Sequence, residues 1–480
     1  MKISPIFFSI PLGLLLLFSC AKDPSTDTSL ITPPEVDTGA LPYIRITTDV
    51  AIENEPKVPG DMAVFENQTL RFSAPVGIEY RGSTSFRLSD KKSYGIETWD
   101  ENDQDVNASI LGFPEEEDWI LTGHVFRSSS NTIFDPSLMH HYIGYELYRS
   151  MGRYASRSKF VELEVNQDYL GTYIFMEKLK RDNHRIDLAK MTPADNELPN
   201  VTGGYILKID KTAGGDVAPN EPLSYYYDNW GDDARYSEAI SFRSNYDIYG
   251  NLLNTPAFDP PYHSGQFLET YFLYEYPKSE EITSAQKQYI QTYLNDFETA
   301  LLEDDFTTDH RTYTQFIDLD SFVDFFIINE ITGNIDGYRI STYLHKERGS
   351  KLKMGPIWDL NIGYNRQNRV PFTDWIAHYN NYVDRDAWMV PFWWPRLLQD
   401  PVFQQRLKQR WQTLRSNQLS TTTVLGLVQS TADYLIENGA IERNYERWNG
   451  LEVDYEQSIE ALKSYLDDRL NWMDEQINAF

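Results

Sequence analysis

The segment DFFIINEITGNIDGYRISTYLHKERGSKLKMGPIWDLNIGYN, residues 324–365, is the part of the sequence from which the fold is inferred. It begins as the apolar face of a helix, turns at Gly333 and presents Asp336 in a polar loop. A strand-like run, Ser341–His345, and a basic turn then lead into a second loop that carries Asp359. Two acidic side chains on loops joined by a short hairpin are suited to holding a metal ion and a proton acceptor close together.

The composition of the chain limits the classes of protein to which it can belong. With 480 residues, of which 41% are hydrophobic and 14% aromatic, it can build a sizeable core and is long enough for two lobes. The formal net charge of −29 argues against nucleic acid as a partner, because phosphate backbones require basic surfaces. Such acidity is typical of a secreted or surface protein that self-repulsion keeps soluble.

The N-terminus predicts export and a lipid anchor. Lys2 precedes an apolar run at residues 6–18, which is too short for a membrane span and indicates a signal peptide at 1–19. The Leu-x-Ser-Cys sequence that ends at Cys20 resembles the lipobox of bacterial lipoproteins, and Cys20 is the only cysteine of the chain. The resemblance implies cleavage before Cys20, lipidation of its sulfur and anchoring in the bacterial cell envelope, at the outer membrane and facing the periplasm or the surface. The alternative is an ordinary signal peptide.

Residues 20–41 are rich in Ser, Thr, Pro and Asp, which predicts a flexible tether before a folded domain at 42–480. We predict strands at 43–48, 70–72, 76–80, 92–99, 160–165, 169–176 and 203–210. A helix is expected to start at Pro136, capped by Asp135, and the chain from residue 284 onward is mainly helical. The order predicts an α+β fold of two lobes, a strand-rich N-lobe at about 42–210 and a helix-rich C-lobe at about 211–480.

Other polar and aromatic residues carry weaker signals. Trp375, Trp388 and the pair Trp393–Trp394 could stack on a sugar, although packing in the protein is the favoured interpretation. His140 and His141 are expected to point to different faces of a helix and not to share a metal ion.

Three pieces of sequence together predict ATP chemistry. The first is Tyr80–Ser85, a turn of small residues, followed by Lys91 and Lys92 at the start of a strand. The second is a strand that ends in Glu177, and the third is the segment with Asp336 and Asp359. A strand lysine, an acid that orients it and two loop aspartates are the groups that phosphoryl transfer from ATP requires. Strand alternation puts the two lysines on opposite faces, so only one can face the nucleotide, and the sequence does not choose between them.

These motifs resemble those of the CotH family, the spore-coat-type secreted atypical protein kinases, and the resemblance covers about residues 42–480. The residues that carry it are Arg81–Ser85 with Lys91–Tyr94, Leu111–Pro114 with Asp118–Leu121, Asn166–Tyr173 with Glu177, Gly204–Asp210, Asn329–Glu330, Asn334–Tyr343, Gly355–Asp359 and Arg469–Asp474. The resemblance implies a two-lobed, kinase-like fold that uses ATP with Mg²⁺ or Mn²⁺.

The resemblance also implies roles for individual residues. Lys92 or Lys91 would contact the nucleotide phosphates and pair with Glu177, and Arg81 belongs to the same nucleotide-binding group. Asp336 would be the catalytic base. Asp359 would be the metal ligand.

The chain departs from the family pattern next to the expected metal ion. Ser341 stands where an asparagine is common, five residues after Asp336, and Asn361 stands where the family often has an aspartate. Both remain candidate metal ligands, and His140-His141 replaces a common Arg-Asn pair. We expect transfer of the ATP γ-phosphoryl group to Ser or Thr hydroxyls of surface proteins. The alternatives are other nucleotide-transfer chemistry and a non-catalytic surface protein that binds a glycan or a protein.

Overall fold

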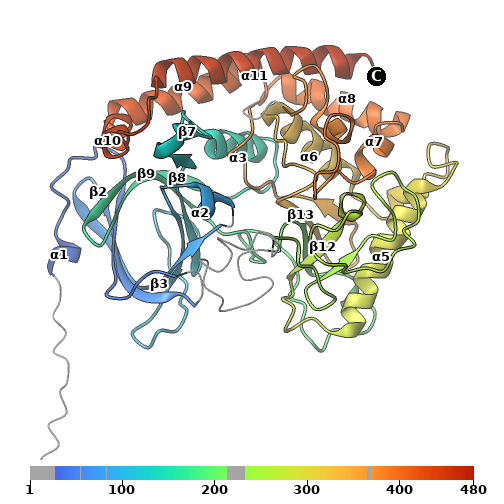
Figure 1. Ribbon diagram of the computed structural model, residues 1–480, viewed down its shortest axis with the longest axis horizontal. Helices are drawn as coiled ribbons and strands as arrows, with labels where there is room; N and C mark the ends of the chain where they lie inside the picture. Colours follow the sequence, from blue (N-terminus) through green and yellow to red (C-terminus); the bar gives the residue numbers. More distant parts are fainter. Residues whose placement is uncertain (1–27, 54–55, 83, 213–232, 365–368) are drawn as a thin grey trace, which may run out of the picture.

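The first part of the chain forms a closed β-barrel (Figure 1). The computed structural model describes residues 28–53, 56–82, 84–212, 233–364 and 369–480. The barrel strands follow the order β1-β2-β3-β4-β5-β9-β8. Their bounds are β1 Tyr43–Thr47, β2 Val58–Glu66, β3 Thr69–Arg81, β4 Ser93–Thr98, β5 Asp118–Thr122, β8 Ser158–Val165 and β9 Asp168–Glu177. Parallel pairing of β1 with β8, Tyr43 opposite Glu162, closes the barrel and leaves no open edge there.

Apolar side chains of alternate strand residues fill the barrel. Ile96, Trp119 and Phe175 are completely or almost completely buried in this core. The β8–β9 hairpin turns at Asn166 and Gln167, whose φ angles of 51° and 66° are those of a tight hairpin turn. The strands predicted at 160–165 and 169–176 therefore form this hairpin.

A second, five-stranded sheet has the order β11-β12-β10-β13-β14. Its strands are β10 Tyr205–Ile209, β11 Ser241–Arg243, β12 Tyr271–Tyr276, β13 Thr342–Lys346 and β14 Leu352–Met354. Strand β10 pairs antiparallel with β13, with Tyr205 opposite Lys346. Strand β10 lies within the range expected for the N-lobe but belongs to this second sheet, and the expected lobe boundary near residue 210 stays a prediction.

Helices pack against both sheets. They are α1 Thr28–Ile31, α2 Thr84–Leu88, α3 His140–Ser150, α5 Ser284–Leu302, α6 Leu319–Thr332, α7 Trp393–Leu397, α8 Pro401–Arg415, α9 Thr421–Glu437, α10 Ala440–Arg447 and α11 Tyr455–Asn478. A short ribbon of β6 Phe126–Arg127 and β7 Thr132–Ile133 precedes α3. Figure 1 shows α11 running along one side of the molecule, from the barrel end to the end near α7 and α8. The expected α+β class, strand-rich first and helical later, is confirmed.

Helix α6 is the buried helix that leads into the first acidic loop. Asp318 caps its N-terminus by accepting a hydrogen bond from Ser321 N at 3.0 Å. Gly333 ends it with a φ of 55°, the left-handed conformation that closes many helices. The predicted apolar helix and its turn at Gly333 are confirmed.

A buried ion pair joins α6 to α11. Arg469 Nη2 lies 2.9 Å from Glu330 Oε2, and both side chains are almost inaccessible to solvent. Glu330 also accepts hydrogen bonds from the backbone amides of Ile376 and Ala377 at 2.7 and 3.0 Å. Burial raises the pKa of Glu330, and the guanidinium of Arg469 opposes that rise.

Two local predictions are wrong. Helix α3 starts at His140 rather than at Pro136. The Asp135 carboxylate accepts hydrogen bonds from Ser137 N at 3.0 Å and from His140 N at 2.8 Å, so the intervening residues form a separate turn. The tether is also shorter than expected, because residues 28–41 lie on the fold: Arg45 Nη1 donates to Thr32 O at 2.6 Å, and Leu41 is buried.

The expected signal peptide and Cys20 lie outside the described residues. Within the described part of the chain, none of the helices has the length and apolar character needed to span a bilayer.

Candidate functional site

Asp336 lies in the turn that follows α6. Its carbonyl accepts a hydrogen bond from Ile340 N at 2.9 Å, and its Oδ1 accepts one from Arg339 Nη2 at 2.6 Å. Arg339 is itself buried and donates to Trp388 O at 2.9 Å, which fixes the guanidinium. The Oδ2 atom of Asp336 accepts no hydrogen bond from the described residues, and the side chain is 18% exposed. One carboxylate oxygen is therefore held and the other is available.

Burial and nearby charges shift the pKa of Asp336 in opposite directions. Burial is the largest influence and raises the pKa of Asp336. Arg339, Lys211 and Arg369 lower it, whereas the negative charge of Asp359 raises it further. The structure thus brings Asp336 and Asp359 within electrostatic reach, as the spacing of the two loops predicts, and makes Asp336 a stronger proton acceptor than an ordinary aspartate.

Helix α3 packs directly against the loop that carries Asp359. A Cβ added to Gly144 would stand 2.0 Å from Leu360 Cδ1, so the glycine leaves room for the buried Leu360 side chain of this loop. One turn earlier, the Nδ1 atom of His140 lies 3.4 Å from Asn361 O, and Tyr364 donates to His140 O at 3.1 Å. These contacts place the loop beside the first turn of α3.

Non-glycine residues with positive φ angles occur in both acidic loops, as they do at eleven other described positions. Tyr338, Ser341, Asp359 and Tyr364 have φ angles of 73°, 50°, 55° and 58°, a conformation that non-glycine residues adopt rarely. Such residues persist where the surrounding structure holds them, and they cluster at functional sites. The surrounding structure therefore holds these four residues in place, and Asp359 is one of them.

Arg81 is the barrel cation that reaches this region. It is the last residue of β3, and its guanidinium carbon lies 5.5 Å from the centre of the Trp358 ring. Cation–π contacts of this kind hold a guanidinium in place. Because Trp358 precedes Asp359, Arg81 lies over the second acidic loop.

The two predicted lysines are held elsewhere. Lys91 is 1% exposed; its ammonium donates to Thr172 O and, at 2.8 Å, to Asn444 Oδ1 of α10. Burial lowers its pKa well below the usual value for lysine. Lys92 points the other way, as strand alternation predicts, and donates to Phe86 O at 2.8 Å and Ser89 O at 2.7 Å, where it closes the end of α2. Both ammonium groups are thus occupied by carbonyl oxygens.

Glu177 pairs with an arginine, so the predicted Lys–Glu pair is wrong. Arg157 donates to Glu177 Oε1 from Nε at 2.9 Å and from Nη2 at 2.5 Å. Tyr154 OH and the backbone amide of Arg157 donate to Oε2 at 3.0 and 2.9 Å. Because these donors occupy both carboxylate oxygens, Glu177 stabilises the junction before β8 and does not orient a lysine.

A divalent cation fits the loop of Asp359. The Asp359 carboxylate is 37% exposed and accepts no hydrogen bond from the described residues, so its lone pairs are free for a cation. The hydroxyl of Ser341 and the side-chain amide of Asn361 likewise have no hydrogen bond to a described residue. Their predicted role as metal ligands stays a prediction.

A separate acidic cluster, Glu116–Asp118, is already neutralised. Lys180 Nζ lies 2.7 Å from Glu116, 2.5 Å from Glu117 and 2.9 Å from Asp118. The ammonium occupies the centre that a metal ion would need, so these carboxylates are structural.

The tryptophans of residues 375–394 form no sugar-stacking platform. Trp375, Trp393 and Trp394 are at most 6% exposed, which confirms that they pack in the core. Trp388 is half-buried and donates to Tyr236 OH at 2.7 Å.

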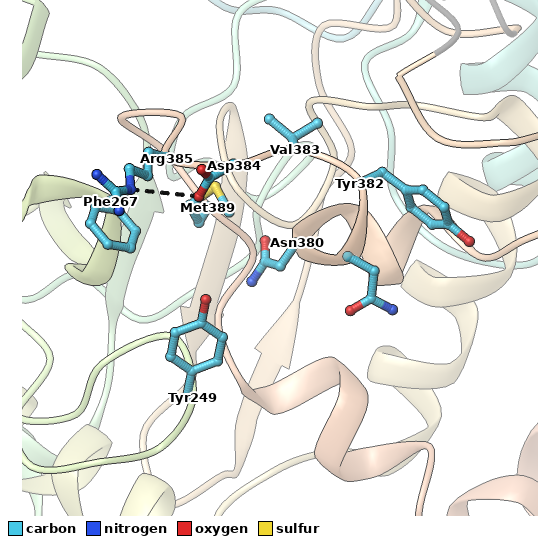
Figure 2. Close-up of a pocket in the computed structure, with 9 residues that line it drawn as sticks. Tyr249, Phe267, Asn380, Tyr382, Val383, Asp384, Arg385 and Met389 are labelled. Atoms are coloured by element: carbon cyan, nitrogen blue, oxygen red, sulfur yellow. Dashed lines mark ion pairs between the residues drawn. The ribbon is translucent and has the colours of Figure 1, made fainter.

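The same segment does border a shallow pocket of about 130 Å³ (Figure 2). Figure 2 shows Arg385 beside Phe267 on one side of this pocket and Tyr382 on the other. The pocket contains none of the predicted site residues.

The sequence interpretation missed several residues that surround the two aspartates. They are Lys211, Arg339, Arg369 and His141, whose Nε2 lies 3.6 Å from Asp359 Oδ1. Arg339 could have been found, because it follows Asp336 at the i,i+3 spacing of an ion pair within one turn. The others come from distant parts of the chain and carry no local signal.

Comparison with known families agrees with these motifs. The family model described as CotH kinase protein matches residues 78–473, which is most of the chain. The match includes Arg81, both acidic loops and Arg469. No curated protein matches the chain.

Proposed function

Because the chain belongs to the family of CotH kinase proteins, we propose that it is a kinase-type enzyme that transfers the γ-phosphoryl group of ATP to Ser or Thr hydroxyls of other proteins. The observation that carries the proposal is the position of Asp336 and Asp359 in the loops that follow α6 and β14, close enough for the charge of Asp359 to act on Asp336. The proposal includes a two-lobed, kinase-like fold. The order of a β-barrel followed by a helical part supports it.

Each residue has a separate task in the proposed reaction. Asp359 would hold the divalent ion, Mg²⁺ or Mn²⁺, that neutralises charge on the phosphates. Arg81 would supply the cation from the barrel, in place of Lys91 and Lys92. Asp336 would accept the proton of the attacking hydroxyl at Oδ2, while Arg339 holds Oδ1 and so fixes the direction of the free oxygen.

The raised pKa of Asp336 is consistent with its task. A carboxylate of higher pKa is a stronger base, and the buried ion pair with Arg339 still favours the ionised form. Catalysis would rest on positioning and on charge neutralisation, because the chemistry needs no covalent intermediate with the protein.

We further propose that the enzyme is a lipid-anchored envelope protein. The lipobox-like sequence that ends at Cys20 supports this location. The acceptor would then be a Ser- or Thr-containing protein on the same side of the membrane.

Labelled ATP tests the proposal directly. Full-length protein with γ-labelled ATP and Mg²⁺ or Mn²⁺ is expected to label itself or a Ser-rich acceptor. Asp336→Asn and Asp359→Asn should each lower the rate about 100-fold or more, since each removes a group that acts on the reacting atoms. Asp320→Asn is the matched control, because Asp320 pairs with Arg406 at an exposed position.

Three results would contradict the proposal or redirect it. Absence of ATP binding in calorimetry with either metal ion would refute it. Labelling that survives Asp336→Asn would refute the assignment of the base. Label transferred from α-labelled ATP would show nucleotidyl transfer instead of phosphoryl transfer.

A further inference from the structure

His141 faces Asp359 across the boundary between α3 and the second acidic loop. The distance from His141 Nε2 to Asp359 Oδ1 is 3.6 Å, and the imidazole is 8% exposed. This distance is too long for an N–H···O hydrogen bond. The two groups are thus neighbours without being bonded to each other.

The separation is close to that of two ligands of one metal ion. Ligand atoms that lie about 2.0–2.2 Å from an ion are about 3.3–3.6 Å apart in tetrahedral geometry and about 2.8–3.1 Å apart in octahedral geometry. The observed separation of 3.6 Å lies at the upper end of the tetrahedral range and about 0.5 Å beyond the octahedral one, a difference that rotation of the two side chains removes.

Both side chains have free lone pairs. Neither nitrogen of His141 has a hydrogen-bond partner among the described residues, although Nδ1 is buried. The Asp359 carboxylate likewise accepts no hydrogen bond there. A neutral imidazole with its proton on Nδ1 presents a lone pair at Nε2, the form in which histidine binds metals.

The backbone around the pair is fixed. The Leu360 side chain packs against Gly144 of α3. His140 Nδ1 also contacts Asn361 O of the same loop. Asp359 itself is held at a positive φ of 55°. A pair of ligands on two elements packed this tightly is arranged before any ion arrives.

We propose that His141 is a ligand of the same ion as Asp359, and that this mixed nitrogen–oxygen site selects a transition-metal ion over Mg²⁺. Imidazole nitrogen suits transition-metal ions, whereas Mg²⁺ prefers oxygen ligands and water. The remaining coordination positions are open to nucleotide phosphates and water. The inference rests on the proposed function for the nucleotide, but the metal site itself can be tested without nucleotide.

Electron paramagnetic resonance of Mn²⁺ provides the test. Full-length protein is titrated with Mn²⁺ alone and with Mn²⁺ plus β,γ-methylene-ATP, and the spin-echo modulation is recorded. A directly bound histidine nitrogen is expected in both samples. Labelling the wild-type protein with ¹⁵N-histidine must replace the ¹⁴N pattern, which separates histidine from adenine and needs no mutation.

The variants measure selectivity. His141→Gln should remove the nitrogen signal and weaken Mn²⁺ binding about tenfold or more, with little change in Mg²⁺ binding. His378→Gln is the matched control, because the Nδ1 atom of His378 is already paired with the Asp374 carboxylate at 2.8 Å. It should keep both the signal and the affinity.

The outcomes separate this inference from the proposed function. A Mn²⁺ spectrum without a histidine nitrogen, or an unchanged Mn²⁺ to Mg²⁺ ratio in a folded His141→Gln variant, overturns the metal assignment even if ATP binds. A histidine nitrogen on Mn²⁺ in a protein that does not bind ATP supports the metal site and refutes the kinase proposal.

Discussion

Arg81, at the end of a barrel strand, lies over the indole ring of Trp358, with 5.5 Å between the guanidinium carbon and the ring centre. The residue after that ring is Asp359. The contact therefore joins the barrel to the second acidic loop and places a cation close to a carboxylate that has no hydrogen bond to a described residue.

We predict that Arg81→Met weakens ATP binding. Loss of charge-assisted hydrogen bonds to phosphate removes about 1.5–3 kcal/mol, which corresponds to roughly a 10- to 100-fold rise in Kd. Calorimetry with ATP and Mn²⁺ measures this. Arg406→Met, which breaks an exposed pair with Asp320, should leave Kd within about threefold. An unchanged Kd for Arg81→Met would remove Arg81 from the nucleotide site.

We predict that Glu177→Gln destabilises the protein and leaves ATP binding unchanged. The side chain is 1% exposed and accepts four hydrogen bonds from Tyr154 and Arg157. Loss of its charge weakens a largely buried pair, and we expect about 2–4 kcal/mol lower stability in urea unfolding. Glu460→Gln, at an exposed pair with Lys463, should change stability by less than about 0.5 kcal/mol. A selective loss of ATP affinity in Glu177→Gln would restore the kinase-like role of this residue.

We predict strong coupling between Glu330 and Arg469. Arg469→Met leaves the Glu330 carboxylate buried without its cation and should lower stability by about 3–5 kcal/mol. The double variant Glu330→Gln, Arg469→Met should be less destabilised than the sum of the single variants, because it buries no charge. Urea unfolding of the four proteins measures the coupling. Additive effects would show that the pair acts through packing alone.

We predict a pH-dependent stability that originates at Glu298. Ser244 OH and Trp393 Nε1 donate to this carboxylate at 2.7 and 2.9 Å, and among the described residues it forms no ion pair. Burial raises its pKa to about 7 from 4.5. The folded state therefore binds a proton that the unfolded state has lost, and stability falls as pH rises between these two values, by about 3 kcal/mol at most.

Glu298→Gln should flatten this dependence. Urea unfolding at about pH 5 and about pH 8 is expected to show a smaller difference in the variant than in the wild-type protein. Glu303→Gln, just beyond the end of α5, should keep the wild-type difference. Equal slopes in the wild-type protein and in Glu298→Gln would mean that Glu298 stays ionised.

Local patterns predicted those elements whose signals are local. Alternation located β1, β4 and β9, and the apolar spacing of α6 ended at Gly333 as expected. Closure of the barrel was not predicted, because the parallel pairing of β1 with β8 depends on residues far apart in the chain. The start of α3 was misplaced because a side chain, Asp135, competes with the helix for its first amides.

In the candidate site, too, features with a local sequence signal were predicted and contacts between distant segments were not. Spacing within one segment predicted that Asp336 and Asp359 would approach each other. Arg81 was identified because it belongs to one of the motifs that resemble the CotH family. The partners of Glu177 and Lys91 could not be predicted, because Arg157 precedes β8 and Asn444 lies on α10. Charge and position in a strand do not reveal which group a side chain meets once distant segments pack.

The ion pair between Glu330 and Arg469 has a consequence for biogenesis. Because α11 is the last helix of the chain, the 24-residue segment that carries Arg469 is synthesised well after α6. The Glu330 carboxylate stays without the Arg469 guanidinium until α11 packs against α6. The order of synthesis thus delays formation of this ion pair, and a chain that ends before residue 469 cannot form it.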